Sequence, residues 1–126
     1  MKEMVYTKEQ IIDVLDEGNF DGFDYCIVSF GFNPCAYVRL HESHKLYGNR
    51  REIEETINCH GGITYADHEL LTMDNEHHKY GYWIGWDYAH FCDHTGYRPD
   101  DGGKKWTTQE ILDEVKEVIK QLKEDN

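Results

Sequence analysis

The chain is poor in positive charge. Its 126 residues contain 25 acidic and 13 basic side chains, and the formal net charge is -12 at pH 7 with histidine neutral. Proteins bind nucleic acid chiefly by neutralising phosphates with lysine and arginine, and anionic membrane surfaces attract the same residues. The charge balance therefore argues against direct binding to nucleic acid or to an anionic membrane. It is compatible with a basic protein partner.

Long apolar segments are missing as well. No stretch approaches the length of a transmembrane helix, and residues 1–7 lack the apolar run that follows the charges of a signal peptide. No C-x-x-C pair occurs among the cysteines, which favours free thiols over disulfides. These are Cys26, Cys35, Cys59 and Cys92. We expect a cytoplasmic protein with a single domain spanning residues 1–126.

The chain also lacks the common catalytic signatures. It has no G-x-S-x-G elbow, no G-x-G-x-x-G after a strand and no Walker lysine. Ser29 lies in an apolar segment, and no cysteine stands at an expected helix N-terminus that would favour its thiolate. The sequence therefore leaves open whether the protein is an enzyme.

A helix is expected at each end of the chain. Residues 7–10 form a capping box, and the apolar residues that follow stop at Gly18, which predicts a short N-terminal helix. Thr107 and Glu110 form a second capping box. The apolar residues after it share one face of a long amphipathic helix: Ile111, Leu112, Val115, Val118, Ile119 and Leu122.

The pattern between these helices is that of strands. Residues 25–30 and 36–40 are rich in apolar and aromatic residues, and the turn residues between them predict an antiparallel hairpin. Residues 41–51 have the composition of a surface loop. Residues 52–59 fit a helix or a strand, and the glycine pair that follows favours the strand. The whole pattern predicts an α+β fold, mainly an antiparallel sheet packed by the C-terminal helix.

Residues 80–88 are expected to form the central strand. Side chains alternate between the two faces of a strand, and here the even-numbered positions are bulky whereas the odd-numbered ones are mostly small. The even face would fill the core. The odd face, with Gly81 and Gly85, would form a trough beside Trp83 and Asp87. Packing against another element and binding of a ligand both explain such a trough, and packing is the commoner cause.

His60, Asp87 and His90 are the main candidates for chemistry. A helical turn at the end of the strand would bring Asp87 and His90 to one side, and two glycines after His60 let the chain bend to present its ring. Two imidazoles and a carboxylate could bind Zn²⁺ or another divalent metal, or form a proton relay. In the structural alternative, Asp87 caps the turn and both histidines are hydrogen-bonded.

The same region is also a candidate site for a small, nucleotide-like ligand. Aromatic rings would stack on the ligand, glycine amides with an arginine would hold an anionic group, and histidines would orient it. The residues of this predicted ligand site are His60, Gly61, Gly62, Tyr65, Trp83, Trp86, Asp87, His90 and Arg39.

Three motifs follow one another in residues 33–122. They are N-P-C-A-Y-V at 33–38, C-H-G-G-I-T-Y at 59–65 and W-I-G-W-D-Y-A-H at 83–90. In this order they resemble a family of small proteins encoded by bacteriophages and by prophage-bearing, largely Gram-positive bacteria. The chain departs from the pattern at Tyr82, where tryptophan is common. The resemblance implies an accessory gene of a phage or mobile element, a class rich in binders and inhibitors of host systems, and it implies no chemistry.

Three functions remain open at this point. The first is a non-catalytic binder of the anti-defence type, which sequesters a small ligand or blocks a host protein in the bacterial cytoplasm. The second is a metal-dependent hydrolase in which His60, Asp87 and His90 hold the ion and leave a position for water. The third is an interaction protein with an acidic binding face. Small size, an aromatic content of 13% and the lack of a catalytic pattern favour the first.

Overall fold

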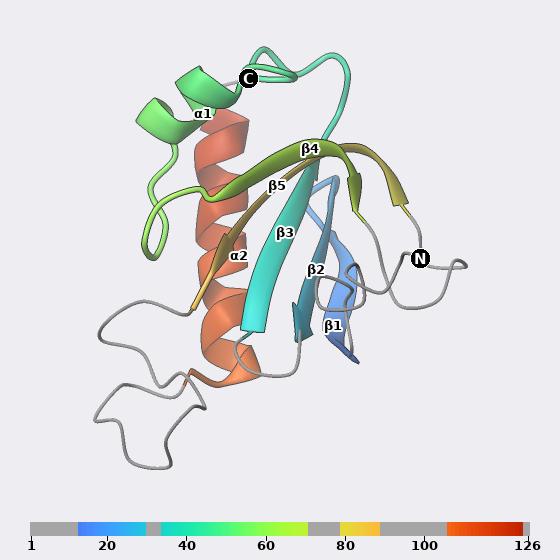
Figure 1. Cartoon of the computed structure of the whole chain (residues 1–126), viewed down its shortest axis with the longest axis vertical. Coiled ribbons are helices and arrows are strands. Elements are labelled where there is room, and N and C mark those ends of the chain that lie inside the picture. Colours follow the sequence, from blue (N-terminus) through green and yellow to red (C-terminus); the bar gives the residue numbers. More distant parts are fainter. Residues whose placement is uncertain (1–12, 30–33, 71–78, 89–105, 125–126) are drawn as a thin grey trace, which may run out of the picture.

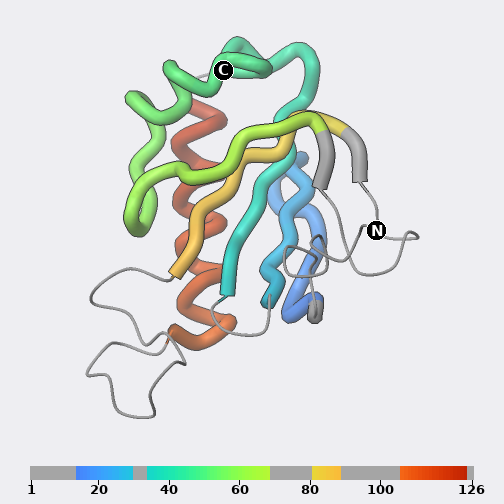
Figure 2. Tube along the Cα trace, viewed as in Figure 1, coloured from blue at the N-terminus to red at the C-terminus, as the bar shows by residue number. Residues whose placement is uncertain are grey.

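The computed structural model describes residues 13–29, 34–70, 79–88 and 106–124, which are drawn in colour in Figure 1; Figure 2 follows the chain as a tube in the same view. Five strands form one antiparallel sheet in the order β1-β2-β3-β5-β4. The elements in chain order are β1 (Asp13–Phe20), β2 (Phe23–Ser29), β3 (Pro34–Leu40), α1 (Arg50–Thr56), β4 (Tyr65–Leu70), β5 (Lys79–Asp87) and α2 (Thr108–Glu124). The long C-terminal helix α2 packs on the sheet (Figure 1), which confirms the predicted α+β class.

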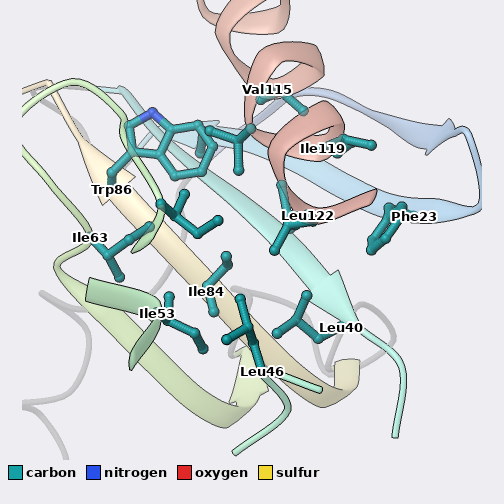
Figure 3. Packing of buried hydrophobic residues seen from close by; sticks show 14 of the residues in the cluster. Phe23, Leu40, Leu46, Ile53, Ile63, Ile84, Trp86, Val115, Ile119 and Leu122 are labelled. Carbon is teal, nitrogen blue, oxygen red and sulfur yellow. The ribbon is translucent and has the colours of Figure 1, made fainter. Parts of the chain in front are cut away.

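Helix α2 begins where the sequence predicts. The backbone N–H of Thr107 donates to Glu110 Oε1 at 3.0 Å, and the N–H of Glu110 donates to Thr107 Oγ1 at 3.1 Å. These reciprocal bonds satisfy donors that a helix start leaves unpaired. The apolar stripe of α2 is buried in the core except for Leu112, which is partly buried. Figure 3 shows Val115, Ile119 and Leu122 of this stripe. No helix in the described part of the chain is long and apolar enough to span a membrane.

The two faces of the sheet differ in what they carry. The helix face, turned toward α2, holds the main core, and the even-numbered residues of β5 from Tyr82 to Trp86 belong to it, as predicted. The opposite face, which we call the far face, carries a smaller buried cluster. Its members are Cys26, Val28, Tyr37 and Trp83. The predicted hairpin of β2 and β3 is confirmed by an antiparallel register that pairs Cys26 with Tyr37.

The predicted N-terminal helix is wrong where its range is described. Residues 13–20 form β1, which pairs antiparallel with β2, and residues 1–12 lie outside the described residues. Asp21 and Gly22 make the turn with positive φ angles of 52° and 91°. Asp-Gly is a preferred sequence for a two-residue hairpin turn. This turn and the ladder with β2 outweigh the helical spacing of the apolar residues.

The predicted strand over residues 52–59 is also wrong, because residues 50–56 form α1. Asn49 caps this helix, and its Oδ1 accepts the N–H of Glu52 at 3.2 Å. Two ion pairs four residues apart support the exposed side: Arg50 with Glu54 at 2.6 Å and Arg51 with Glu55 at 3.4 Å. Helix α1 buries Ile53 in the main core. The capping residue and the charge spacing were the local signals for a helix.

Candidate functional site

His60 lies in a turn that packs against α2. Its ring stacks on Tyr88, with centroids 4.9 Å apart and planes 6° from parallel, and it also contacts Trp106 at 4.9 Å. Its backbone N–H donates to Glu114 Oε2 of α2 at 2.7 Å. The imidazole is therefore part of an aromatic cluster that attaches this turn to the helix.

A hydrogen-bond chain continues from Glu114 into the core. The hydroxyl of Tyr88 donates to Glu114 Oε1, and Trp86 Nε1 donates to the Tyr88 hydroxyl oxygen at 2.9 Å. Burial, reinforced by the bond to Glu114, raises the pKa of Tyr88. Trp86 is only 1% exposed and uses its indole N–H inside the protein. The ring that the sequence predicts as a stacking surface is here a core side chain.

The glycine pair after His60 makes a tight turn. Gly61 and Gly62 have φ angles of 72° and 84°, a region that glycine enters without steric cost. The N–H of Gly62 donates to the carbonyl oxygen of Cys59 at 3.0 Å. This amide, predicted to hold an anion, is thus already used by the turn.

Asp87 is the last residue of β5. Its register partner on β3 is Cys35, and its Oδ2 accepts a hydrogen bond from Thr64 Oγ1 at 3.2 Å. His60 stacks on the next residue, Tyr88, and the charge of Asp87 is one of the causes that raise the pKa of Cys59, the residue before His60. His90 lies outside the described residues.

No three His, Cys, Asp or Glu side chains of the described residues form a group that could hold a metal ion. The predicted trio of His60, Asp87 and His90 includes one residue that the structure does not describe, so a zinc site stays a prediction of the sequence.

The cysteines in the described ranges are free thiols, as predicted. Burial, together with the charge of the nearby Asp87 carboxylate, raises the pKa of Cys35 to about 12. Burial, together with the charge of Glu114, likewise raises the pKa of Cys59 to about 12. Both thiols are protonated at neutral pH and are poor nucleophiles, because the thiolate is the reactive form.

We expect stability to fall above about pH 9. Cys35 and Cys59 have pKa values of about 12 in the folded protein against an ordinary value of 9.0, so the folded state holds these protons more tightly. This contribution is complete below pH 9 and is lost as the pH rises toward 12. The melting temperature, followed by circular dichroism, should drop by about 5 °C or more between pH 9 and 11. A Cys35→Ala variant should show a shallower drop, and a constant melting temperature would contradict the argument.

The trough on the far face of β5 is filled by side chains of the neighbouring strands. A Cβ atom at Gly85 would lie 2.3 Å from Cδ1 of Tyr37 and 2.9 Å from the carbonyl oxygen of Ala36. Tyr37 on β3 and Tyr65 on β4 are the register partners of Gly85, and their rings meet edge to face at 5.3 Å. Tyr65, predicted to stack on a ligand, packs against Tyr37 instead. Packing therefore accounts for the glycine at position 85.

A cavity of about 710 Å³ lies where β3 runs into the loop that follows it. Arg39 and Leu40 of β3 and Gly81 of β5 contribute to the wall, and the loop after β3 and His68 of β4 supply the rest. The described lining residues are Arg39, Leu40, His41, Glu42, Ser43, Tyr47, His68 and Gly81. Arg39 belongs to the predicted ligand site, and the other described members of that prediction are not in this wall.

The Arg39 side chain contacts Asp24 of β2 and lies close to Gly81 of β5. Its Nη1 donates to Asp24 Oδ2 at 3.1 Å, and a Cβ atom at Gly81 would approach its Nε to 2.3 Å. Two buried side-chain atoms among the described residues have no hydrogen-bond partner, Arg39 Nε and Trp83 Nε1. A buried donor without an acceptor costs about 1–3 kcal/mol. Trp83 is 2% exposed, so its ring offers no free stacking surface.

Sequence reasoning missed most of the cavity wall. His41 and His44 both lie in residues 41–51, which the sequence predicts to be a surface loop. The structure separates them, since His41 is exposed and lines the cavity, whereas His44 is 5% exposed and lies in the core. Tyr47 is held beside the cavity by ring contacts with His68 at 5.7 Å and with Tyr82 at 5.4 Å. These contacts join residues that are far apart in the sequence, so no local sequence pattern predicts them.

The function has to be argued from this geometry and from the sequence. The resemblance to phage-encoded proteins depends on the three sequence motifs alone. Comparison of the chain with protein-family models, curated proteins and solved structures finds no match.

Proposed function

We propose that this protein is a non-catalytic binder that takes a small ligand in the cavity beside Arg39. The observation that carries the proposal is the cavity itself. Its volume of about 710 Å³ falls within the roughly 300–1,000 Å³ typical of small-molecule sites. Together with the motifs, this supports an accessory protein of a phage or mobile element that sequesters a ligand in the host cytoplasm.

The chemistry of the wall suits a planar ligand that carries an anionic group. Tyr47 presents a half-buried ring whose position is fixed by Tyr82 and His68. Arg39 supplies a guanidinium oriented by Asp24, and Ser43 supplies a hydroxyl at the exposed rim. Aromatic faces with a few placed polar groups are what small-molecule sites use for affinity and orientation. A nucleotide-like compound meets these requirements.

Several features favour binding over catalysis. Ser43, a hydroxyl in the wall, forms no hydrogen bond with a histidine in the part of the chain that the structure describes. An activated nucleophile normally needs such a base. The thiols of Cys35 and Cys59 are held in the protonated form.

The alternative of a metal-dependent hydrolase has less support. The ring of His60 stacks on Tyr88 and contacts Trp106, and the Asp87 carboxylate accepts a hydrogen bond from Thr64. The described residues contain no group of three His, Cys, Asp or Glu side chains that could hold a metal ion. Blocking of a host protein by the acidic surface stays a prediction of the sequence.

Calorimetric titration with a panel of nucleosides and nucleotides tests the proposal. We expect saturable binding of at least one compound to the wild type. Replacement of Ser43 by tryptophan should fill the cavity from its exposed rim and weaken that binding by at least about tenfold, or 1.4 kcal/mol. Glu55→Trp, on the exposed side of α1, adds the same ring away from the cavity and should leave the affinity unchanged. Absence of heat with every compound, or equal affinity in Ser43→Trp, would overturn the proposal.

A further inference from the structure

Two unpaired N–H donors lie on neighbouring strands of the far face. Arg39 on β3 and Trp83 on β5 are register partners in the antiparallel ladder, so their side chains leave the sheet on the same face next to each other. Arg39 Nε and Trp83 Nε1 are the buried side-chain atoms of the described residues that lack a partner. The two unmet hydrogen bonds thus occur at one place in the fold.

These unpaired donors are exceptional among the residues that the structure describes. The indole N–H of Trp86, also deeply buried on β5, is satisfied by the Tyr88 hydroxyl at 2.9 Å. Native proteins pair nearly all buried polar groups with a hydrogen-bond partner. Two neighbouring buried donors without a partner therefore need a specific explanation. Functional sites, where a bound molecule supplies the missing partner, are one such explanation.

Both missing partners are of the same kind. An indole N–H and a guanidinium N–H can only donate, so what would complete them is an acceptor oxygen. A hydrogen bond from a guanidinium to an oxyanion is charge-assisted and stronger than one to a neutral carbonyl. A cation is disfavoured there, because both groups present hydrogens and one of them is positively charged.

The position of Arg39 connects this pair to the cavity. The Arg39 side chain lines the cavity, is anchored through Nη1 to Asp24, and passes over Gly81, where a larger residue would collide with it. The glycine therefore leaves room for the Arg39 side chain beside the cavity. A ligand in the cavity would contact Arg39, whose register partner on β5 is Trp83.

We infer that the ligand of the cavity carries an oxyanion, a carboxylate or a phosphate, whose oxygen accepts hydrogen bonds from Arg39 Nε and Trp83 Nε1. The inference rests on the proposed function and names the chemical class of its ligand. It assigns to Trp83 the role of a hydrogen-bond donor instead of a stacking surface.

Nuclear magnetic resonance of the ¹⁵N-labelled full chain tests the inference directly. The protein is titrated with sodium phosphate, sodium acetate and sodium chloride at equal ionic strength. We expect the Trp83 Nε1–H and Arg39 Nε–H signals to move downfield with phosphate or with acetate, and not with chloride. The Trp86 indole signal, whose N–H is already bonded to Tyr88, serves as the internal reference. If the signals respond to only one of phosphate and acetate, the response shows whether the oxyanion of the ligand is a phosphate or a carboxylate.

Two conservative variants test the donors separately. Trp83→Phe keeps an aromatic ring and removes the N–H, and Arg39→Lys keeps the charge and removes Nε. Each should weaken binding of the responding oxyanion by about tenfold. Trp106→Phe, which removes an indole beside His60, should leave it unchanged. The inference is overturned if neither wild-type signal moves, or if Trp83→Phe binds the oxyanion as tightly as the wild type; the wild-type titration decides even where a variant does not fold.

Failure of this inference differs from failure of the proposed function. If uncharged nucleosides bind in a way that Ser43→Trp abolishes while no oxyanion moves the two signals, the cavity is a ligand site and the oxyanion assignment is wrong. If the oxyanions move the signals but neither nucleosides nor nucleotides bind, the oxyanion site stands and the proposed nucleotide-like ligand is wrong.

Discussion

Replacement of His44 by alanine is expected to lower the free energy of unfolding by about 3 kcal/mol. His44 is 5% exposed, and its Nδ1 accepts the N–H of Leu46 at 3.1 Å. Its Nε2 therefore carries the hydrogen and donates to the carbonyl oxygen of Leu122 at 2.8 Å. That carbonyl lies in the last turn of α2, where it has no partner within the helix. Alanine would leave both groups unpaired and open a cavity in the core.

The nearby His41 is a matched control for this experiment. It is exposed, and its Nε2 lies 3.0 Å from the carbonyl oxygen of Gly22. His41→Ala should lower the free energy of unfolding by less than about 1 kcal/mol, because water replaces an exposed hydrogen bond. Urea denaturation followed by circular dichroism measures both variants. Equal effects of the two substitutions would show that His44 does not anchor its loop to α2.

Substitution of Gly85 by alanine should destabilise the fold by a similar amount, about 3 kcal/mol. The added Cβ would lie 2.3 Å from the ring of Tyr37 and 2.9 Å from the backbone oxygen of Ala36. The ring cannot simply turn aside, because Tyr65 contacts it from the other neighbouring strand at 5.3 Å. Relief of the clash would require the central strands to separate.

Gly18→Ala is the control for this second prediction. Gly18 is also a strand glycine, but it lies on the edge strand β1 and is exposed. Its Cβ would come no closer than 3.2 Å to another atom, the hydroxyl oxygen of Tyr25. We expect a change within about 1 kcal/mol in the same denaturation assay. If Gly85→Ala proved equally mild, the fit of the Tyr37 ring over Gly85 would not contribute to stability.

The candidate site was only partly accessible from the sequence. Arg39 was predicted to help hold an anionic group of the ligand, and it lines the cavity. Its companions His68 and Gly81 come from strands far along the chain, and the residues after β3 looked like a polar loop. The His60 segment drew attention through its glycines and imidazole, but these residues serve a turn packed on α2. Glycines after a histidine indicate a tight turn of the backbone, but they do not indicate what the imidazole ring contacts.

The parts of this protein that the sequence determined by itself are those governed by neighbours along the chain. The capping box and apolar stripe specified α2, and strict alternation specified which side of β5 enters the core. The tertiary structure decided that residues 13–20 become a strand, that Tyr37 fills the trough, and that Arg39 and Trp83 lie together with unmet hydrogen bonds. The reason is physical: periodicity and caps act within one or two turns, whereas packing and buried polar pairing depend on partners that only the folded chain brings together.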